Sequence, residues 1–151
     1  ALAVVMFGDS VDGTLARMTT GGTRFGAFLD STLDRLADGA VFGSLTAFAV
    51  FRMADSPVRT WVIIAGICSI IGAAAVPYAR ARAESVGVVA KLGIAERTDR
   101  LIVGMGSAMI MSLGAPEWVL AVGLTWVAFA SFVTVCQRIW FTARHIDEGA
   151  S

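Results

Sequence analysis

Two runs of twenty residues without a charged side chain constrain the fold of this chain more than any other feature. They cover residues 60–79 and 118–137 of a chain of 151 residues. About twenty apolar residues in a helix are enough to cross the hydrocarbon core of a bilayer. The composition agrees, because 56% of the residues are hydrophobic, only 16% are charged, and the mean hydropathy is +0.73. These features predict a membrane protein built from helices.

The rest of the chain shows helical patterns and no strand-like alternation. Further helices are predicted at residues 1–18, at 26–52 and, as a shorter segment, from about 98 to 116. We therefore expect an all-α, polytopic membrane helical bundle with five segments, forming a single domain over residues 1–151. The first residues are apolar and lack an initiator Met, so we expect one more helix upstream and six in the full protein. Small residues such as Gly72, Gly104 and Gly106 should let the helices approach closely.

The basic residues are distributed unevenly between the two ends of this expected bundle. If the segments alternate in direction, residues 17–25, a polar connection at 80–100 and a polar tail after 137 share one side. That side holds nine of the twelve Lys and Arg residues. Cytoplasmic loops of membrane proteins carry an excess of Lys and Arg. We therefore expect this side to face the cytoplasm. The net charge of the whole chain is zero, which gives no reason to expect nucleic acid as a partner.

Four aspartates lie close together near this side. Asp9 and Asp12 are three residues apart, and Asp30 and Asp34 are four apart, so each pair shares one face of a helix. A turn rich in Gly and Thr at residues 18–25 can fold the second helix back on the first. The two pairs of carboxylates should then face each other.

Four carboxylates at such short range repel one another, so they need protons or cations between them. Oxygen ligands suit the hard cations Mg²⁺ and Mn²⁺, and one or two ions would match four carboxylates. The stretch contains no His or Cys, which argues against zinc. Solvated surface acids are the alternative, but ionisable residues in membrane segments are costly and usually functional.

This stretch resembles the signature of the CDP-alcohol phosphatidyltransferase family, D-x2-D-G-x2-A-R-x8-G-x3-D-x3-D. All eight fixed positions match, namely Asp9, Asp12, Gly13, Ala16, Arg17, Gly26, Asp30 and Asp34. Eight fixed residues at fixed gaps over 26 positions form a highly specific pattern. The resemblance implies a bacterial, multi-pass enzyme of the inner membrane that uses CDP-diacylglycerol and is a homodimer.

The resemblance also implies roles for the aspartates. Asp9, Asp12 and Asp30 would hold one metal ion, and Asp9, Asp30 and Asp34 would hold or border a second. The ions would be Mg²⁺ or Mn²⁺. Asp34 would be the catalytic general base that deprotonates the acceptor alcohol.

Three further residues match or adjoin positions that contact the CDP part of the donor in this family. Gly13 would allow close backbone approach, and Arg17 would bind pyrophosphate oxygens. Thr23, in the turn, is a weaker candidate that could equally be an ordinary turn hydroxyl. Asp38 continues the face of Asp30 and Asp34, and we expect it to pair with Arg35 or with a neighbouring helix.

The acceptor is indicated by arginines at the predicted cytoplasmic ends of helices: Arg80, Arg82, Arg97, Arg100 and Arg138. Such residues often only anchor a protein to anionic lipid. Several converging guanidiniums beside a metal site suit a phosphorylated alcohol. The surrounding sequence looks like the actinobacterial phosphatidylinositol phosphate synthases of the family, whose acceptor is inositol 1-phosphate. We expect Arg97 and Arg138 to bind that phosphate, with Arg80 as the third candidate.

Two alternatives remain open at this point. Glycerol 3-phosphate also carries a phosphate and is the second candidate acceptor for the same chemistry. A divalent-cation transporter would use intramembrane carboxylates as well, but it has no need for Arg17 at a fixed distance from its acids. Metal-dependent binding of CDP would distinguish an enzyme from a transporter.

Overall fold

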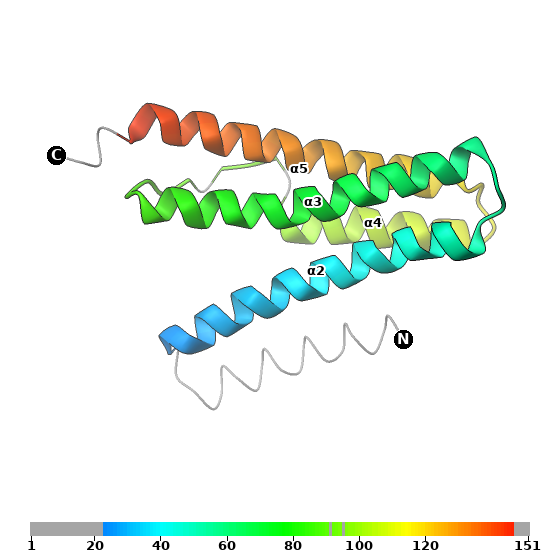
Figure 1. The fold of residues 1–151 in the computed structure, drawn as a ribbon, viewed down its shortest axis with the longest axis horizontal. Coiled ribbons are helices and arrows are strands. Elements are labelled where there is room, and N and C mark those ends of the chain that lie inside the picture. The colour runs from blue at the N-terminus through cyan, green and yellow to red at the C-terminus, as the bar shows by residue number, and fades with distance from the viewer. Residues whose placement is uncertain (1–22, 91, 95, 147–151) are drawn as a thin grey trace.

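The computed structural model describes residues 23–90, 92–94 and 96–146, and within them it contains four helices (Figure 1). These are α2 (Arg24–Arg52), α3 (Pro57–Ser85), α4 (Arg97–Ser112) and α5 (Trp118–His145). The all-α prediction is confirmed for this part of the chain. The fifth predicted segment, residues 1–18, lies outside the described residues.

Local sequence explains where α2 and α3 begin. The hydroxyl of Thr23 accepts a hydrogen bond from the backbone N–H of Gly26 at 3.0 Å, and so caps α2. Ser56 caps α3 in the same way through the N–H of Arg59 at 3.1 Å. Pro57 occupies the first turn of α3, where a missing N–H costs nothing.

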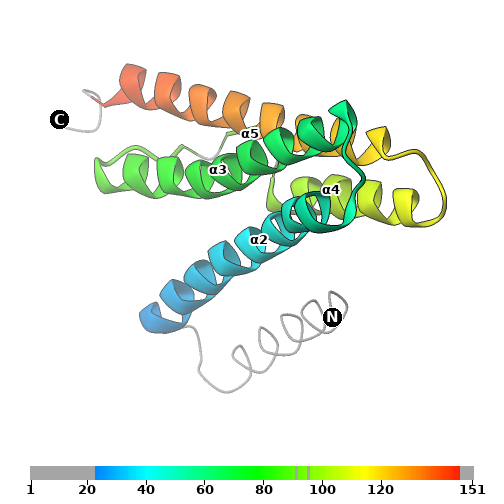
Figure 2. The same ribbon diagram turned by 45° about the vertical axis from the view of Figure 1, so that its right-hand side comes forward.

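Helices α3 and α5 lie side by side along most of their length, and α4 packs beside them (Figure 1). Helix α2 contacts α3 near its C-terminal end, whereas its N-terminal half diverges from the other helices (Figure 2). The core between the helices is apolar, and its most deeply buried members are Phe42, Ala49, Val62, Leu120, Leu124 and Val127. The end of the bundle that carries the start of α2 and the C-termini of α3 and α5 is therefore more open than the opposite end.

Glycines bring these helices into close contact, as predicted for Gly72 and Gly104. A Cβ atom at Gly72 of α3 would lie 2.6 Å from the Cβ of Ser131 on α5. A Cβ atom at Gly104 of α4 would lie 2.8 Å from the ring of Phe42 on α2. The same expectation is wrong for Gly106, where an added Cβ would meet nothing within 4 Å.

These two environments give a matched pair of stability predictions. We expect Gly72→Ala to lower the free energy of unfolding by about 1–3 kcal/mol, the usual cost of overpacking a core, because α3 and α5 must move apart. Gly106→Ala should be neutral or stabilise the protein by up to about 1 kcal/mol, since alanine favours helix over glycine. Thermal unfolding in detergent measures both. Equal effects of the two substitutions would contradict the predicted contact between α3 and α5.

Part of the predicted polar connection at 80–100 and the first residues of the predicted polar tail after 137 are helical instead. Helix α3 continues past residue 79 to Ser85, and α5 continues past residue 137 to His145. An ion pair of 2.9 Å between Arg80 and Glu84, four residues apart, stabilises the added turns of α3. In α5 the guanidinium of Arg144 lies 3.9 Å from the ring centre of Trp140. Polar composition was therefore a poor guide to where these helices end.

The apolar character of the helices agrees with a membrane setting. Within the described residues, α3 and α5 are long and apolar enough to cross a bilayer. Only 39% and 50% of the residues in their most apolar windows are buried, so half or more of each window is not buried within the described part of the chain. Large apolar side chains are exposed there, including Ile64, Ile67, Ile71, Phe129 and Phe132. Such surface fits lipid better than water.

Candidate functional site

Three aspartates lie along one face of α2, at intervals of four residues. Asp30 is exposed, the side chain of Asp34 is 21% exposed, and Asp38 is buried at 2%. The acidic face therefore runs from the open end of α2 into the interior. The other predicted ligands, Asp9 and Asp12, lie outside the described residues, as do the predicted donor contacts Gly13 and Arg17.

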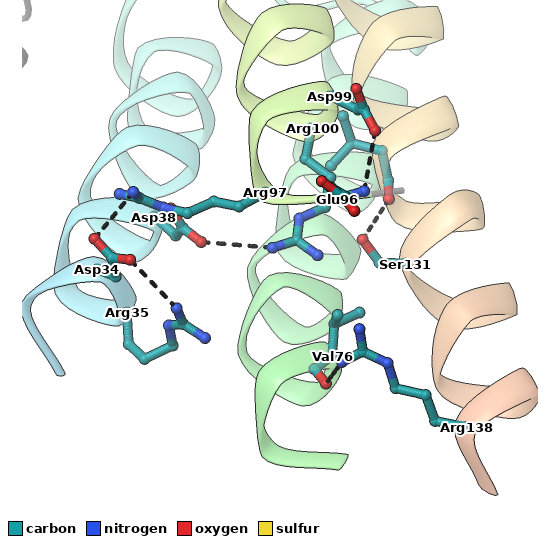
Figure 3. Close-up of polar contacts among 11 residues, drawn as sticks. Asp34, Arg35, Asp38, Val76, Glu96, Arg97, Asp99, Arg100, Ser131 and Arg138 are labelled. Carbon is teal, nitrogen blue, oxygen red and sulfur yellow. Dashed lines mark hydrogen bonds and ion pairs between the residues drawn. The ribbon is translucent and has the colours of Figure 1, made fainter. Parts of the chain in front are cut away.

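Asp34 is paired with arginines from two helices (Figure 3). Its Oδ1 lies 2.9 Å from Nη1 of Arg97 on α4. Its Oδ2 lies 3.7 Å from Nη2 of Arg35, the next residue of α2. The residue predicted to be the general base thus contacts two guanidinium groups.

Asp38 also pairs with α4, as expected for a partner on a neighbouring helix. Its Oδ1 accepts a hydrogen bond from Nε of Arg97 at 2.9 Å. Its Oδ2 lies 3.6 Å from Nη2 of Arg100. Among the described residues, Arg35 pairs with Asp34, and no ion pair joins it to Asp38.

The start of α4 sets the positions of these arginines. The side chain of Asp99 accepts a hydrogen bond from the backbone N–H of Glu96 at 3.0 Å, half of a capping arrangement that begins the helix at Arg97. Arg97 and Arg100 are then three residues apart and lie on the same face. That face points toward the acidic side of α2 (Figure 3).

A cavity of about 460 Å³ lies beside this cluster, and we call it the arginine cavity. Five arginines and one acid line it with four apolar or small residues, and the charged members are Arg35, Arg80, Glu96, Arg97, Arg100 and Arg138. All three arginines predicted to bind the acceptor phosphate are present. Arg82 lines a different, largely apolar cavity between α3 and α5.

Two arginines of the cavity were not among the predicted acceptor residues. Arg35 lies inside α2 rather than at a helix end, so the distribution of arginines at helix ends does not reveal it. Arg100 lies at the start of α4 beside Arg97. Its side chain is only 3% exposed, and its Nε and Nη1 atoms have no hydrogen-bond partner among the described residues. Buried donors of this kind are costly, so an anionic ligand in the cavity would satisfy them.

Arg138 and Arg80 are held from the opposite wall. Nε of Arg138 donates to the carbonyl of Leu92 at 2.9 Å, and its Nη1 donates to the carbonyl of Val76 (Figure 3). Arg80 pairs with Glu84. Arg138 therefore joins α5 to α3 and to the segment before α4, and its charge has no acidic partner in these contacts.

The described half of the predicted metal site fits a hard cation. Asp30 and Asp34 present carboxylate oxygens on one helix face, with Asp34 near the surface. No group of three or more His, Cys, Asp or Glu side chains that could hold a metal occurs within residues 23–90, 92–94 and 96–146. Completion of a site would need carboxylates such as Asp9 and Asp12, so the full set of ligands stays a prediction. Thr23 caps α2, and its predicted role toward the nucleotide also stays a prediction.

Comparison with known proteins identifies a family and relatives that this chain resembles. Residues 1–134 match the family model described as CDP-alcohol phosphatidyltransferase. The phosphatidylinositol phosphate synthase of Mycobacteroides abscessus is 40% identical over 140 residues, which is 91% of this chain and 62% of that protein. The phosphatidylinositol phosphate synthase of Mycobacterium tuberculosis is 38% identical over 147 residues, 94% of this chain and 66% of that protein. The chain thus spans slightly less than two thirds of the length of these relatives.

Solved structures agree in fold. The crystal structure of the M. tuberculosis phosphatidylinositol phosphate synthase in complex with manganese and citrate matches with a TM-score of 0.78 and 37% identity, covering 89% of this chain and 64% of that one. The structure of the same enzyme with CDP-DAG bound matches with a TM-score of 0.77 and 38% identity, covering 89% and 66%. With the signature over Asp9 to Asp34, the match over residues 1–134 and these likenesses, the chain belongs to the CDP-alcohol phosphatidyltransferase family.

Proposed function

We propose that this chain transfers a phosphatidyl group from CDP-diacylglycerol to a hydroxyl of inositol 1-phosphate, giving phosphatidylinositol phosphate and CMP. The observation that carries the acceptor assignment is the arginine cavity directly beside Asp34. Its wall holds five guanidiniums against one carboxylate, Glu96. A phosphomonoester provides the negative charge and the several acceptor oxygens that such a wall needs. Serine and free inositol carry no phosphate and would leave the positive charge of this wall uncompensated.

The reaction needs few groups from the protein. The acceptor hydroxyl oxygen forms a bond to the phosphorus that carries diacylglycerol, and the bond from that phosphorus to the oxygen of CMP breaks. Asp34 takes the proton of the attacking hydroxyl, and CMP leaves with the bonding electrons. A divalent cation at the aspartates would neutralise the pyrophosphate charge when bound. The nearby arginines hold the acceptor by its own phosphate and so orient its hydroxyl toward Asp34.

The relatives support the donor and the metal. The M. tuberculosis enzyme has been solved with CDP-DAG in one structure and with manganese in another. We infer that Mg²⁺ or Mn²⁺, as two ions, binds the four motif aspartates of this chain, and that Gly13, Arg17 and Thr23 contact the nucleotide. The homodimer implied by the family also remains a proposal.

The proposed orientation in the membrane rests on the arginines at one end of the bundle. Figure 1 shows the start of α2 and the C-termini of α3 and α5 at one end. Arg24, Arg80, Arg82, Arg138 and Arg144 belong to these helix ends. An end rich in arginine is the one expected to face the cytoplasm. The site would then open at the depth of the lipid headgroups of a bacterial inner membrane, where a lipid donor and a soluble acceptor can meet.

The decisive experiment measures CMP release from CDP-diacylglycerol by the full-length protein with Mg²⁺. Inositol 1-phosphate, glycerol 3-phosphate, free inositol and serine are compared as acceptors. We expect release with inositol 1-phosphate, loss of release on chelation of the metal, and recovery when Mg²⁺ or Mn²⁺ is restored.

Other results would change the assignment in defined ways. Release with glycerol 3-phosphate alone would keep the chemistry and make the protein a phosphatidylglycerophosphate synthase. Release with serine or free inositol but with neither phosphate ester would overturn the role of the arginine cavity. Release that persists without divalent metal would contradict the metal site.

A further inference from the structure

Asp38 lies behind the arginine cavity and is not one of its lining residues. Its side chain is 2% exposed, deeper than Asp34 one turn before it on α2. Each of its two oxygens meets a different arginine of α4, Oδ1 at 2.9 Å from Arg97 and Oδ2 at 3.6 Å from Arg100. A single buried carboxylate thus contacts two residues of the cavity wall.

These contacts influence the orientation of the two arginine side chains. Arg97 and Arg100 are one helical turn apart, and without a nearby anion their charges would drive the side chains apart. The contact with Asp38 engages Nη2 of Arg100, whereas Nε and Nη1 of the same guanidinium stay without a hydrogen-bond partner in the described part of the chain. Asp38 Oδ2 likewise has no hydrogen-bond partner in the described part of the chain, so its contact with Arg100 is an ion pair of 3.6 Å without a hydrogen bond. Since Arg100 lines the cavity, this ion pair attracts one edge of the guanidinium toward α2 and leaves its other N–H groups available to a ligand.

Asp38 also links the two halves of the proposed site. It lies four residues after Asp34 on the same face of α2 (Figure 3). Through Arg97 and Arg100 it holds the start of α4, and with it the cavity wall, at a fixed place relative to Asp34. We propose that Asp38 is a positioning residue for the acceptor: it does not touch the acceptor, but sets the arginines that bind it against the helix that carries the base. This inference rests on the proposed function.

A purely structural role is the competing explanation, because a buried carboxylate that loses its partners or is removed usually destabilises a protein. The two roles differ in what they predict for the substrates. A structural defect lowers stability and affects donor and acceptor alike. Loss of positioning weakens the binding of the acceptor phosphate in the protein that remains folded.

The test uses Asp38→Asn in the full-length protein, which keeps the size of the side chain and removes its charge. We expect the acceptor KM to rise about 10- to 100-fold, the range seen when a group that orients a binding residue is lost. The donor KM should stay within about twofold, since Asp38 is not among the proposed donor contacts. Asp38→Glu restores the charge and should recover at least part of the acceptor affinity.

Asp55→Asn is the matched control. Asp55 forms an ion pair of 2.6 Å with Arg59, but its side chain is 95% exposed and it lies in the turn between α2 and α3. This substitution should leave both KM values unchanged. If Asp38→Asn changes both KM values equally, or changes neither, the positioning role is wrong.

Binding of inorganic phosphate gives a readout that does not depend on turnover. Calorimetry of the folded proteins should show weaker phosphate binding for Asp38→Asn than for wild type, with Asp38→Glu between them. Equal phosphate binding by all three proteins would overturn the inference even if Asp38→Asn were unstable. Failure of the wild type to use inositol 1-phosphate would instead overturn the proposed function, and the phosphate measurement would still decide the role of Asp38.

Discussion

Asp34→Asn is expected to reduce turnover by about 10²–10⁴-fold, the usual contribution of a general base, while binding of CDP-diacylglycerol largely persists. The substitution keeps the shape of the side chain but removes the group that takes the proton of the acceptor. Asp34 lies 2.9 Å from Arg97 and 3.7 Å from Arg35, so its carboxylate stands next to two residues of the arginine cavity, in which the acceptor phosphate would bind. CMP release and donor binding, measured on the same preparation, separate the two effects.

Asp55→Asn again serves as the control, because it removes an exposed acid from the turn between α2 and α3, away from the site. It should retain wild-type turnover. Near-normal turnover of Asp34→Asn would remove Asp34 as the base. A complete loss of donor binding would indicate that Asp34 matters chiefly to the metal and the pyrophosphate.

The acidic half of the site could be predicted from the sequence because its geometry is local. Residues four apart in a helix share a face whatever the rest of the fold does. The structure bears this out for Asp30, Asp34 and Asp38, although the role of each carboxylate remains to be measured. Helix ends were less predictable. Arg80 and Arg138 lie in segments predicted to be polar, yet both residues are helical, Arg80 in α3 and Arg138 in α5.

The arginine cavity depends on tertiary structure, and here the sequence was a partial guide. Its arginines come from α2, α3, α4 and α5. Alternation of the helices was enough to bring Arg80, Arg97 and Arg138 to one end. It could not reveal that Arg35, inside α2, faces the same cavity, nor that Arg82 faces another one. Those outcomes depend on how each helix is rotated about its axis, which its neighbours decide.

The second large effect is expected on substitution of Arg138, which lines the arginine cavity, whereas Arg82 does not. Arg138→Gln is expected to raise the acceptor KM about 10- to 100-fold, because hydrogen bonds from a charged group contribute about 1.5–3 kcal/mol. Glutamine can still donate one hydrogen bond, but it has no charge for a phosphate. The donor KM should change much less. Steady-state kinetics with each substrate varied in turn provides the measurement.

Arg82→Gln removes the same charge from the same end of the bundle and is therefore the control for long-range electrostatics. Arg82 lies outside the arginine cavity and bonds to Ser85 on its own helix. If general attraction of anions to this end of the protein were the cause, both substitutions would raise the acceptor KM alike and salt would erase the effect. If the cavity binds the acceptor phosphate, only Arg138→Gln raises the acceptor KM. A larger rise in the donor KM than in the acceptor KM would place Arg138 with the nucleotide instead.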